Sequence, residues 1–229
     1  MKKQLIAVAA IGLLAGTASA QSAFEGFYGQ VSTGYENNTI ANGSPTLSGG
    51  VTATGSGTNT SSNGNVPVIA GLGYTFSVDP QYTLGLGVDY SFLNQNTSNV
   101  STNWSGGASG NSGNFYYQIS NRTNIYLTPG YALSKDSLVY LKAGYSMENI
   151  QAKPSGGGTA TNTASVSGYI FGLGYKQMIT SGLYGFAEGN YMGYSKPQLS
   201  TYNVAGYTTN INPGAPSAYN ILVGLGYKF

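Results

Sequence analysis

The last segment of the sequence, Tyr219 to Phe229, mostly alternates large apolar residues with small or polar ones. Such alternation over about ten residues is typical of a transmembrane β-strand that has lipid on one face and a lumen on the other. Strands can satisfy all their backbone hydrogen bonds in hydrocarbon only by closing into a barrel. This one segment therefore predicts an all-β fold, an antiparallel up-and-down barrel in a membrane.

The beginning of the sequence has the pattern of a cleaved secretory signal. Two lysines precede an apolar run from Leu5 to Leu14, and the small-residue motif Ala18-Ser19-Ala20 follows it. The run is shorter than the about 20 residues that a membrane-spanning helix needs. We therefore expect residues 1–20 to be removed and residues 21–229 to form one barrel domain.

Charge and composition exclude several functions. Without the two leader lysines, seven of the nine Lys and Arg remain against seven Asp and Glu, so the mature chain is close to neutral. No basic stripe that could bind nucleic acid is present, and we exclude that partner. The sequence has no His and no Cys, which removes the commonest metal ligands and the usual general base. We expect no cofactor, no metal and no catalytic residue.

Eight segments of the mature chain show strand-like alternation. Tight turns at Asp79-Pro80, Lys135-Asp136 and Ser181-Gly182 join three pairs of them, and the other links are long. Short turns at one end and long loops at the other are the layout of outer-membrane barrels. The eight predicted strands cover residues 24–35, 66–78, 82–93, 115–133, 138–150, 165–179, 183–195 and 219–229.

The four long links, residues 36–65, 94–114, 151–164 and 196–218, are rich in Gly, Ser, Thr and Asn and show little apolar periodicity. Residues of this kind are typical of solvated surface loops. We expect these loops to be mobile, to lie outside the cell and to be available to surface ligands.

A repeated tetrapeptide, Gly-Leu-Gly-Tyr, ends at Tyr74, Tyr175 and Tyr227, and a related Pro-Gly-Tyr ends at Tyr131. In the predicted topology all four strands descend toward the short turns, which brings the four tyrosines to one height. Aromatic residues at one height form the girdle at a membrane interface, here the periplasmic one. The glycines do not fit a phosphate-binding motif, because they lie inside predicted strands and do not open a helix.

The alternation also places charged residues in the lumen, since a charge facing lipid costs up to about 2 to 4 kcal/mol at the bilayer midplane. If the turns centre on Lys135 and Gly182, Arg122 opposes Glu148 and Lys176 opposes Glu188 in two salt bridges. The predicted lumen charges are Asp89, Arg122, Lys142, Glu148, Lys176 and Glu188.

Two features of this arrangement remain open. Pointing Arg122 inward leaves Asn121 and Thr123 facing outward, which indicates a bulge or an exit from the membrane. The charges either form an ion path or fill the lumen as a paired polar plug. The narrow interior of an eight-stranded barrel favours the plug, whereas many inward glycines would leave space for water.

With the leader, the eight strands, the long loops and the terminal Tyr227-Lys228-Phe229 in place, the mature chain resembles the small outer-membrane barrels of Gram-negative bacteria, of the OmpA-like and opacity type. The resemblance implies residence in the outer membrane, among its lipid and lipopolysaccharide, after insertion by the barrel-assembly machinery. Gly224, Tyr227 and Phe229 look like the glycine and aromatic positions of the family's assembly signal. Leu222 departs from the polar residue usually found in that signal.

The leading functional hypothesis is a non-enzymatic barrel with a structural role, whose loops are displayed at the surface and are rich in residues that suit weak adhesion. The alternative is a small porin-like pore for ions or small solutes, motivated by the charged lumen. A third hypothesis is catalysis, because some eight-stranded barrels modify lipid A. That resemblance relies on a catalytic His, which this chain lacks.

Overall fold

A computed structural model describes residues 22–50, 52–58, 61–109, 112–156, 160–200 and 208–229. The predicted leader, residues 1–20, lies outside this part of the chain. The described residues form β-strands joined by turns and irregular links. None of them belongs to a helix long and apolar enough to cross a membrane.

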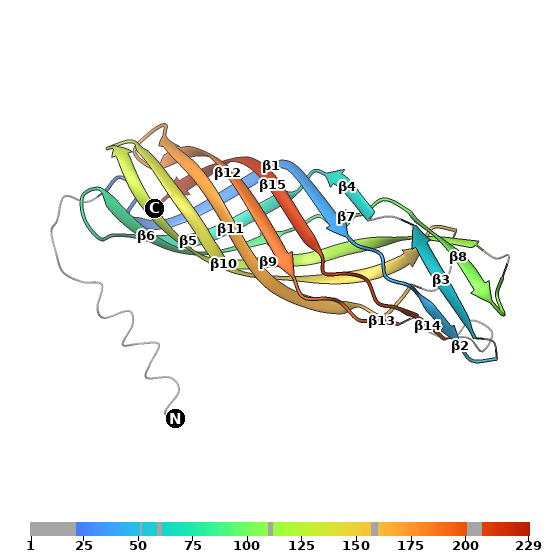
Figure 1. The fold of residues 1–229 in the computed structure, drawn as a ribbon. Helices are drawn as coiled ribbons and strands as arrows, with labels where there is room; N and C mark the ends of the chain where they lie inside the picture. Colours follow the sequence, from blue (N-terminus) through green and yellow to red (C-terminus); the bar gives the residue numbers. More distant parts are fainter. Residues whose placement is uncertain (1–21, 51, 59–60, 110–111, 157–159, 201–207) are drawn as a thin grey trace, which may run out of the picture.

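Eight long strands form an antiparallel ring (Figure 1). They are β1 (Gly26–Ile40), β5 (Val68–Ser77), β6 (Tyr82–Ser91), β9 (Ser112–Ser134), β10 (Ser137–Pro154), β11 (Ala164–Met178), β12 (Leu183–Tyr194) and β15 (Ser217–Lys228). Each strand pairs with the next, and β15 pairs with β1, which closes the ring. The predicted eight-stranded barrel is confirmed, with all three tight turns at one end.

The two faces of the strands differ as predicted. Burial alternates residue by residue along β6, where Leu86 and Val88 are exposed and Asp89 is buried. On β10, Leu141 is likewise exposed while Lys142 is buried. An apolar outer wall around a polar interior is the arrangement that a barrel needs in lipid.

The described parts of the long links contain short strands, which we did not expect there. Short strands within them pair with one another and with the outer end of β9, and Figure 1 shows them extending beyond the ring at the end opposite the tight turns. We call this extension the loop sheet, and its strands pair in the order β8 (Val100–Gly106), β3 (Ala53–Thr58), β2 (Thr46–Ser48), β14 (Thr208–Ile211) and β13 (Leu199–Ser200). Two further short strands lie beside the ring, β4 (Ser61–Asn65) on β1 and β7 (Gln95–Asn96) on β9.

An apolar cluster, the outer core, joins the loop sheet to the barrel. It brings together inward-facing residues from the outer ends of the ring strands and residues of the loop strands, among them Val100 of β8, Leu199 of β13 and Ile211 of β14. Ile40 and Ile150 of this cluster are fully buried. Burial of apolar side chains therefore orders this end of the molecule.

A β-bulge at Asn121 marks the border between the outer core and the polar lumen. The pairing of β9 with β10 shifts between Met147 and Asn149, and Asn121 has a φ of 53°. The extra residue reverses which positions of β9 face inward, so that Arg122 is buried on one side of the bulge and Ile119 on the other. The bulge that the sequence indicated is confirmed.

The left-handed backbone at Asn121 predicts a selective response to substitution. Asn121→Val should destabilise the folded barrel by about 1 to 2 kcal/mol, because a β-branched residue is strained at positive φ. Asn121→Gly keeps the backbone free of this strain, and Thr123→Val is the control on the same outward side. Urea unfolding in detergent micelles, followed by gel mobility of the folded form, measures the difference. An Asn121→Val protein as stable as the Thr123→Val control would contradict the assignment.

Candidate functional site: the barrel lumen

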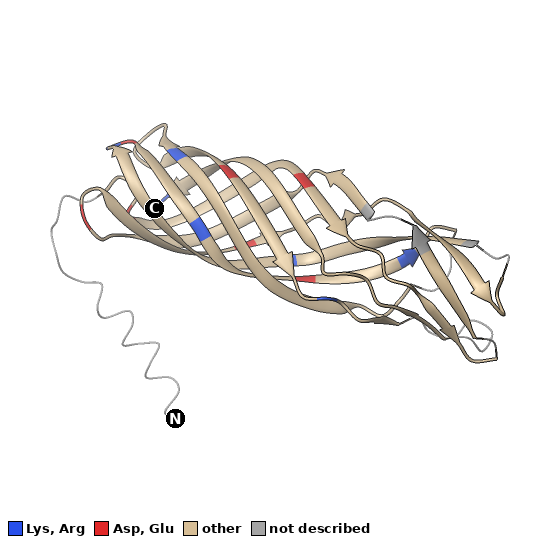
Figure 2. Cartoon of the chain, in the orientation of Figure 1, with Lys and Arg blue, Asp and Glu red and all other residues tan. Residues whose placement is uncertain are grey.

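Seven charged side chains of the described chain are buried inside the ring, where Figure 2 shows the coloured positions distributed along the strands. Six of them are the predicted lumen charges. The seventh is Glu36 of β1, which is fully buried and lies within the first predicted loop, residues 36–65. The alternation from Tyr28 through Ser32 continues to Glu36 and could have identified it. Four carboxylates and three cations leave one negative charge in excess.

The first cluster surrounds Arg122 of β9. Its guanidinium donates to Glu148 of β10, with Nε to Oε2 at 2.8 Å, and to Asn38 of β1, with Nη2 to Oδ1 at 2.7 Å. Its Nη1 lies 2.5 Å from Oε1 of Glu36. The predicted Arg122–Glu148 pair is confirmed, and a second carboxylate from across the ring joins it.

The second cluster surrounds Lys142 of β10. Its Nζ lies 2.9 Å from Oδ2 of Asp89 on β6 and 2.9 Å from Oε1 of Glu188 on β12. Asn124 donates to the other oxygen of Asp89 at 2.6 Å, and Tyr140 donates to Oε2 of Glu188 at 2.8 Å. Every carboxylate oxygen of this cluster is therefore bonded to a side-chain donor.

The predicted Lys176–Glu188 pair is wrong. The hairpin pairs Met178 with Tyr184, which centres the turn on Ser181 and not on Gly182. A one-residue shift of the centre moves the register by two residues, so Glu188 still faces inward but lies opposite Gly174. Its cation is Lys142.

Lys176 lies among aromatic rings. Its Nζ is 4.4 Å from the ring centre of Tyr28, 5.0 Å from that of Tyr184 and 5.2 Å from that of Tyr140. The ion pairs formed by the described residues do not include it. Ring faces attract a cation, which partly compensates for the loss of its hydration.

Two amide side chains connect the clusters. Asn220 of β15 donates to Oε2 of Glu36 at 3.1 Å. Asn190 of β12 donates to Asn220 and to Oε1 of Glu188, both at 2.8 Å. The polar network is therefore continuous from Glu36 to Asp89. Counting residues outward from the hairpin turns could not predict this link, because it crosses strands that no tight turn joins.

The inward glycines accommodate aromatic rings. A Cβ atom added at Gly174 would overlap the ring of Tyr140, and one added at Gly226 would overlap the ring of Tyr184. The expectation that these glycines leave space for water is therefore wrong at these positions, because inward tyrosines of the neighbouring strands cover them.

An apolar cluster lies near the tight turns. This turn-end cluster consists of Phe24, Tyr28, Leu138, Met178, Tyr184 and Phe186. It includes Tyr28 and Tyr184, which flank Lys176. Together with the outer core at the opposite end, it encloses the charged middle of the lumen between two apolar layers.

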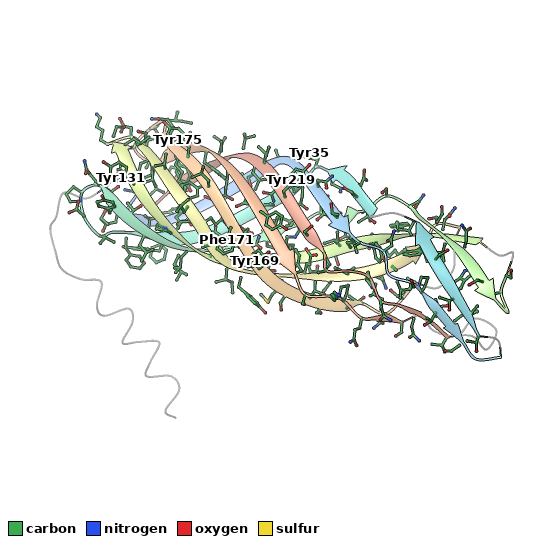
Figure 3. The ribbon with its side chains drawn as sticks, viewed as in Figure 1. Tyr35, Tyr131, Tyr169, Phe171, Tyr175 and Tyr219 are labelled. Atoms are coloured by element: carbon green, nitrogen blue, oxygen red, sulfur yellow. The ribbon has the colours of Figure 1, made fainter. Side chains whose placement is uncertain are left out.

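The four tyrosines predicted for the periplasmic girdle lie in strands of the outer wall. Figure 3 shows Tyr131 and Tyr175 toward the end of the tight turns, with Tyr35, Tyr219 and Tyr169 nearer the middle of the molecule. Tyr74 packs against Phe27 with ring centres 4.7 Å apart, and Tyr227 packs against Phe229 at 5.4 Å. The girdle role of Tyr74, Tyr131, Tyr175 and Tyr227 stays a prediction.

Two residues of the predicted assembly signal, Gly224 and Tyr227, lie on the closing strand β15, and the third, Phe229, directly follows it. Gly224 faces the ring of Phe186, which a Cβ atom at this position would overlap. The amide of Phe229 donates to the carbonyl of Phe27 on β1 at 2.9 Å. Leu222 is buried, facing inward. These contacts place the residues of the predicted signal beside the β15–β1 closure, and their role in assembly stays a prediction.

Removing the cation of the first cluster should destabilise the barrel strongly. Arg122→Met leaves two buried carboxylates without a cation, which we expect to lower the free energy of unfolding by about 3 to 5 kcal/mol. The triple variant Arg122→Met, Glu36→Gln, Glu148→Gln should recover most of that loss. Urea titration in lipid vesicles measures both, and equal stability of the single and triple variants would argue against the cluster.

The corrected register can be tested by two double-mutant cycles. Combining Glu188→Gln with Lys142→Met should show a coupling free energy of about 0.5 to 3 kcal/mol, because the two side chains are in contact. The matched cycle with Lys176→Met should show a smaller coupling. Unfolding free energies from the same titration provide both values, and a larger coupling with Lys176 would restore the original pairing.

The chain matches the family model described as outer membrane protein beta-barrel domain over residues 6–229. No curated protein matches it. Solved structures similar to it include Ail of Yersinia pestis, at 13% identity and a TM-score of 0.41, with 90% of this chain and 99% of that chain covered. They also include the outer membrane protein OprG from Pseudomonas aeruginosa, at 14% identity and a TM-score of 0.49, with 90% and 96% covered. Since the family model spans nearly the whole sequence, the chain belongs to the outer-membrane β-barrel family and is a protein of the bacterial outer membrane.

Proposed function

We propose that this protein is a non-enzymatic barrel with a sealed lumen, which supports the outer membrane and displays the loop sheet at the cell surface. The observation that carries the proposal is the filled interior. Arg122 and Lys142 each bond two carboxylates, and apolar clusters lie on both sides of this network.

The energetics favour a closed lumen over a conducting one. Opening a path would separate buried ion pairs, and breaking one such pair costs about 3 to 5 kcal/mol. Each 1.4 kcal/mol reduces the open population about tenfold, so separating even one cluster would make open states rare. A small pore is the alternative function, and it would require the two clusters to exchange partners.

The lumen carboxylates also support a non-enzymatic role. Asp89, Glu148 and Glu188 are buried and bonded to a cation, as is Glu36. A general acid or base has to reach a proton on the substrate, which these groups cannot do while they are paired and enclosed.

Export and insertion complete the proposal. Residues 1–20 act as the leader that is removed, and residues 21–229 form the inserted domain. The barrel-assembly machinery recognises the closing strand through Gly224, Tyr227 and Phe229, which lie beside the strand that the ring must close onto. Outer-membrane lipid and lipopolysaccharide contact the apolar wall, and extracellular ligands contact the loops.

Conductance in a planar bilayer separates the two functions. Refolded protein from Gln21 to Phe229 should give no steady channel openings, and Glu148→Gln should also stay silent, because the Lys142 cluster and both apolar layers remain. Folding of each sample is checked by heat-modifiable gel migration. Steady openings of the wild-type protein that the variant alters would establish the pore in place of the plug.

A further inference from the structure

We infer that the outer face of the loop sheet is a binding surface for uncharged glycans. The inference rests on the proposed surface display and names the class of partner. The strands β2, β3 and β8 present on one face a set of exposed short polar side chains, which we call the hydroxyl face: Thr46, Ser48, Thr54, Ser56, Ser101, Asn103 and Ser105.

The strand register brings these side chains together. Thr54 lies opposite both Thr46 and Ser105, and Ser56 lies opposite Asn103. Neighbouring strands are about 4.8 Å apart, and alternate residues along a strand are about 6.6 Å apart. The hydroxyl face is therefore a regular array of groups at spacings that several hydroxyls of one oligosaccharide can span.

The opposite side of the same strands is buried, which fixes the array. Val100, Thr102 and Ala53 alternate with residues of the hydroxyl face and are almost inaccessible to solvent. Gly55 packs closely against Thr102 and Trp104, where an added Cβ atom would overlap the Thr102 side chain. Because the backbone is held by pairing on both sides of β3, little ordering is left for binding to impose.

The absence of charge selects the kind of partner. The strands β2, β3, β8, β13 and β14 contain no Lys, Arg, Asp or Glu, and Figure 2 shows their described parts without charged positions. A sulfated or otherwise anionic polysaccharide would find no cation on this face. An apolar partner would find short hydroxyl and amide groups that it cannot hydrogen-bond.

A neutral glycan matches what the face offers. Ser and Thr hydroxyls both donate and accept, and the Asn amide does the same through two separate atoms. Sugar hydroxyls also donate and accept, so they can bond these groups without a net charge. The hydroxyls of Ser48, Ser56 and Ser105 already donate to carbonyls of the neighbouring strand, and they offer their lone pairs to a sugar. A neutral hydrogen bond contributes about 0.5 to 1.5 kcal/mol, so one hydroxyl face binds a glycan with low affinity. Many copies of the protein on one membrane raise the overall avidity for a polysaccharide.

Display is tested first and separately. The chain contains no cysteine, so Asn103→Cys introduces a single thiol on the hydroxyl face. A membrane-impermeant maleimide should label it on intact cells, whereas Lys135→Cys at a tight turn should stay unlabelled. Failure of Asn103→Cys to label in folded protein would overturn the proposed surface display itself, whatever the glycan experiment gives.

Binding is then measured with vesicles that carry the full-length mature protein, on surfaces coated with dextran, mannan or dextran sulfate. We expect retention on at least one neutral polysaccharide and none above protein-free vesicles on dextran sulfate. Asn103→Asp and Thr54→Arg should each weaken retention about tenfold, because a charge is desolvated without a partner. Asn94→Asp, at an exposed position between β6 and β7, is the matched control and should bind like the wild type.

The outcomes that overturn the inference are distinct from those that overturn display. Labelled, folded protein that binds neither dextran nor mannan, or that binds dextran sulfate equally well, has no neutral-glycan surface. Vesicles that aggregate with each other in the absence of polysaccharide, and lose this with Asn103→Asp, would identify a second copy of the chain as the partner instead.

Discussion

Every charge inside this barrel has to be satisfied by another side chain, because hydrocarbon surrounds the wall and apolar clusters lie at both ends of the lumen. The solution is two cations that each connect distant strands. Arg122 ties β9 and β10 to Glu36 on β1, across the ring, and Lys142 ties β10 to β6 and β12. The lumen network therefore holds distant strands of the ring together.

How far the sequence predicts these contacts depends on what sets each pairing. Arg122–Glu148 follows from the tight turn at Lys135, since a hairpin fixes the register of its own two strands. The same logic failed for Glu188, because the turn centre was placed one residue too late. Contacts across the ring, such as Glu36 with Arg122, depend on the stagger of all eight strands, which a single sequence does not reveal.

The strands of the loop sheet could not be predicted from the alternation of apolar and polar residues. Strand alternation identifies segments of about ten residues, whereas β2 and β13 are far shorter. The partner of β2 in β14 is also distant in sequence, since Ser48 pairs with Thr208. Each of these short strands has one apolar residue, such as Leu199, which shows no periodicity in the sequence. The role of Leu199 in packing is visible only in the folded chain, where it joins the outer core. Long-range burial, and not local periodicity, orders this end of the molecule.

The bulge at Asn121 separates the charged lumen of the barrel from the apolar outer core. On one side of it, inward positions of β9 supply the charged network, and on the other side they supply the outer core. Leu199 and Ile211 belong to that core, so substitutions there affect the barrel and the loop sheet together. Exposed residues of the hydroxyl face, such as Asn103, have no such role in packing. The proposed recognition on this face can therefore change by substitution without loss of the membrane fold, because packing and the proposed binding use opposite sides of the same strands.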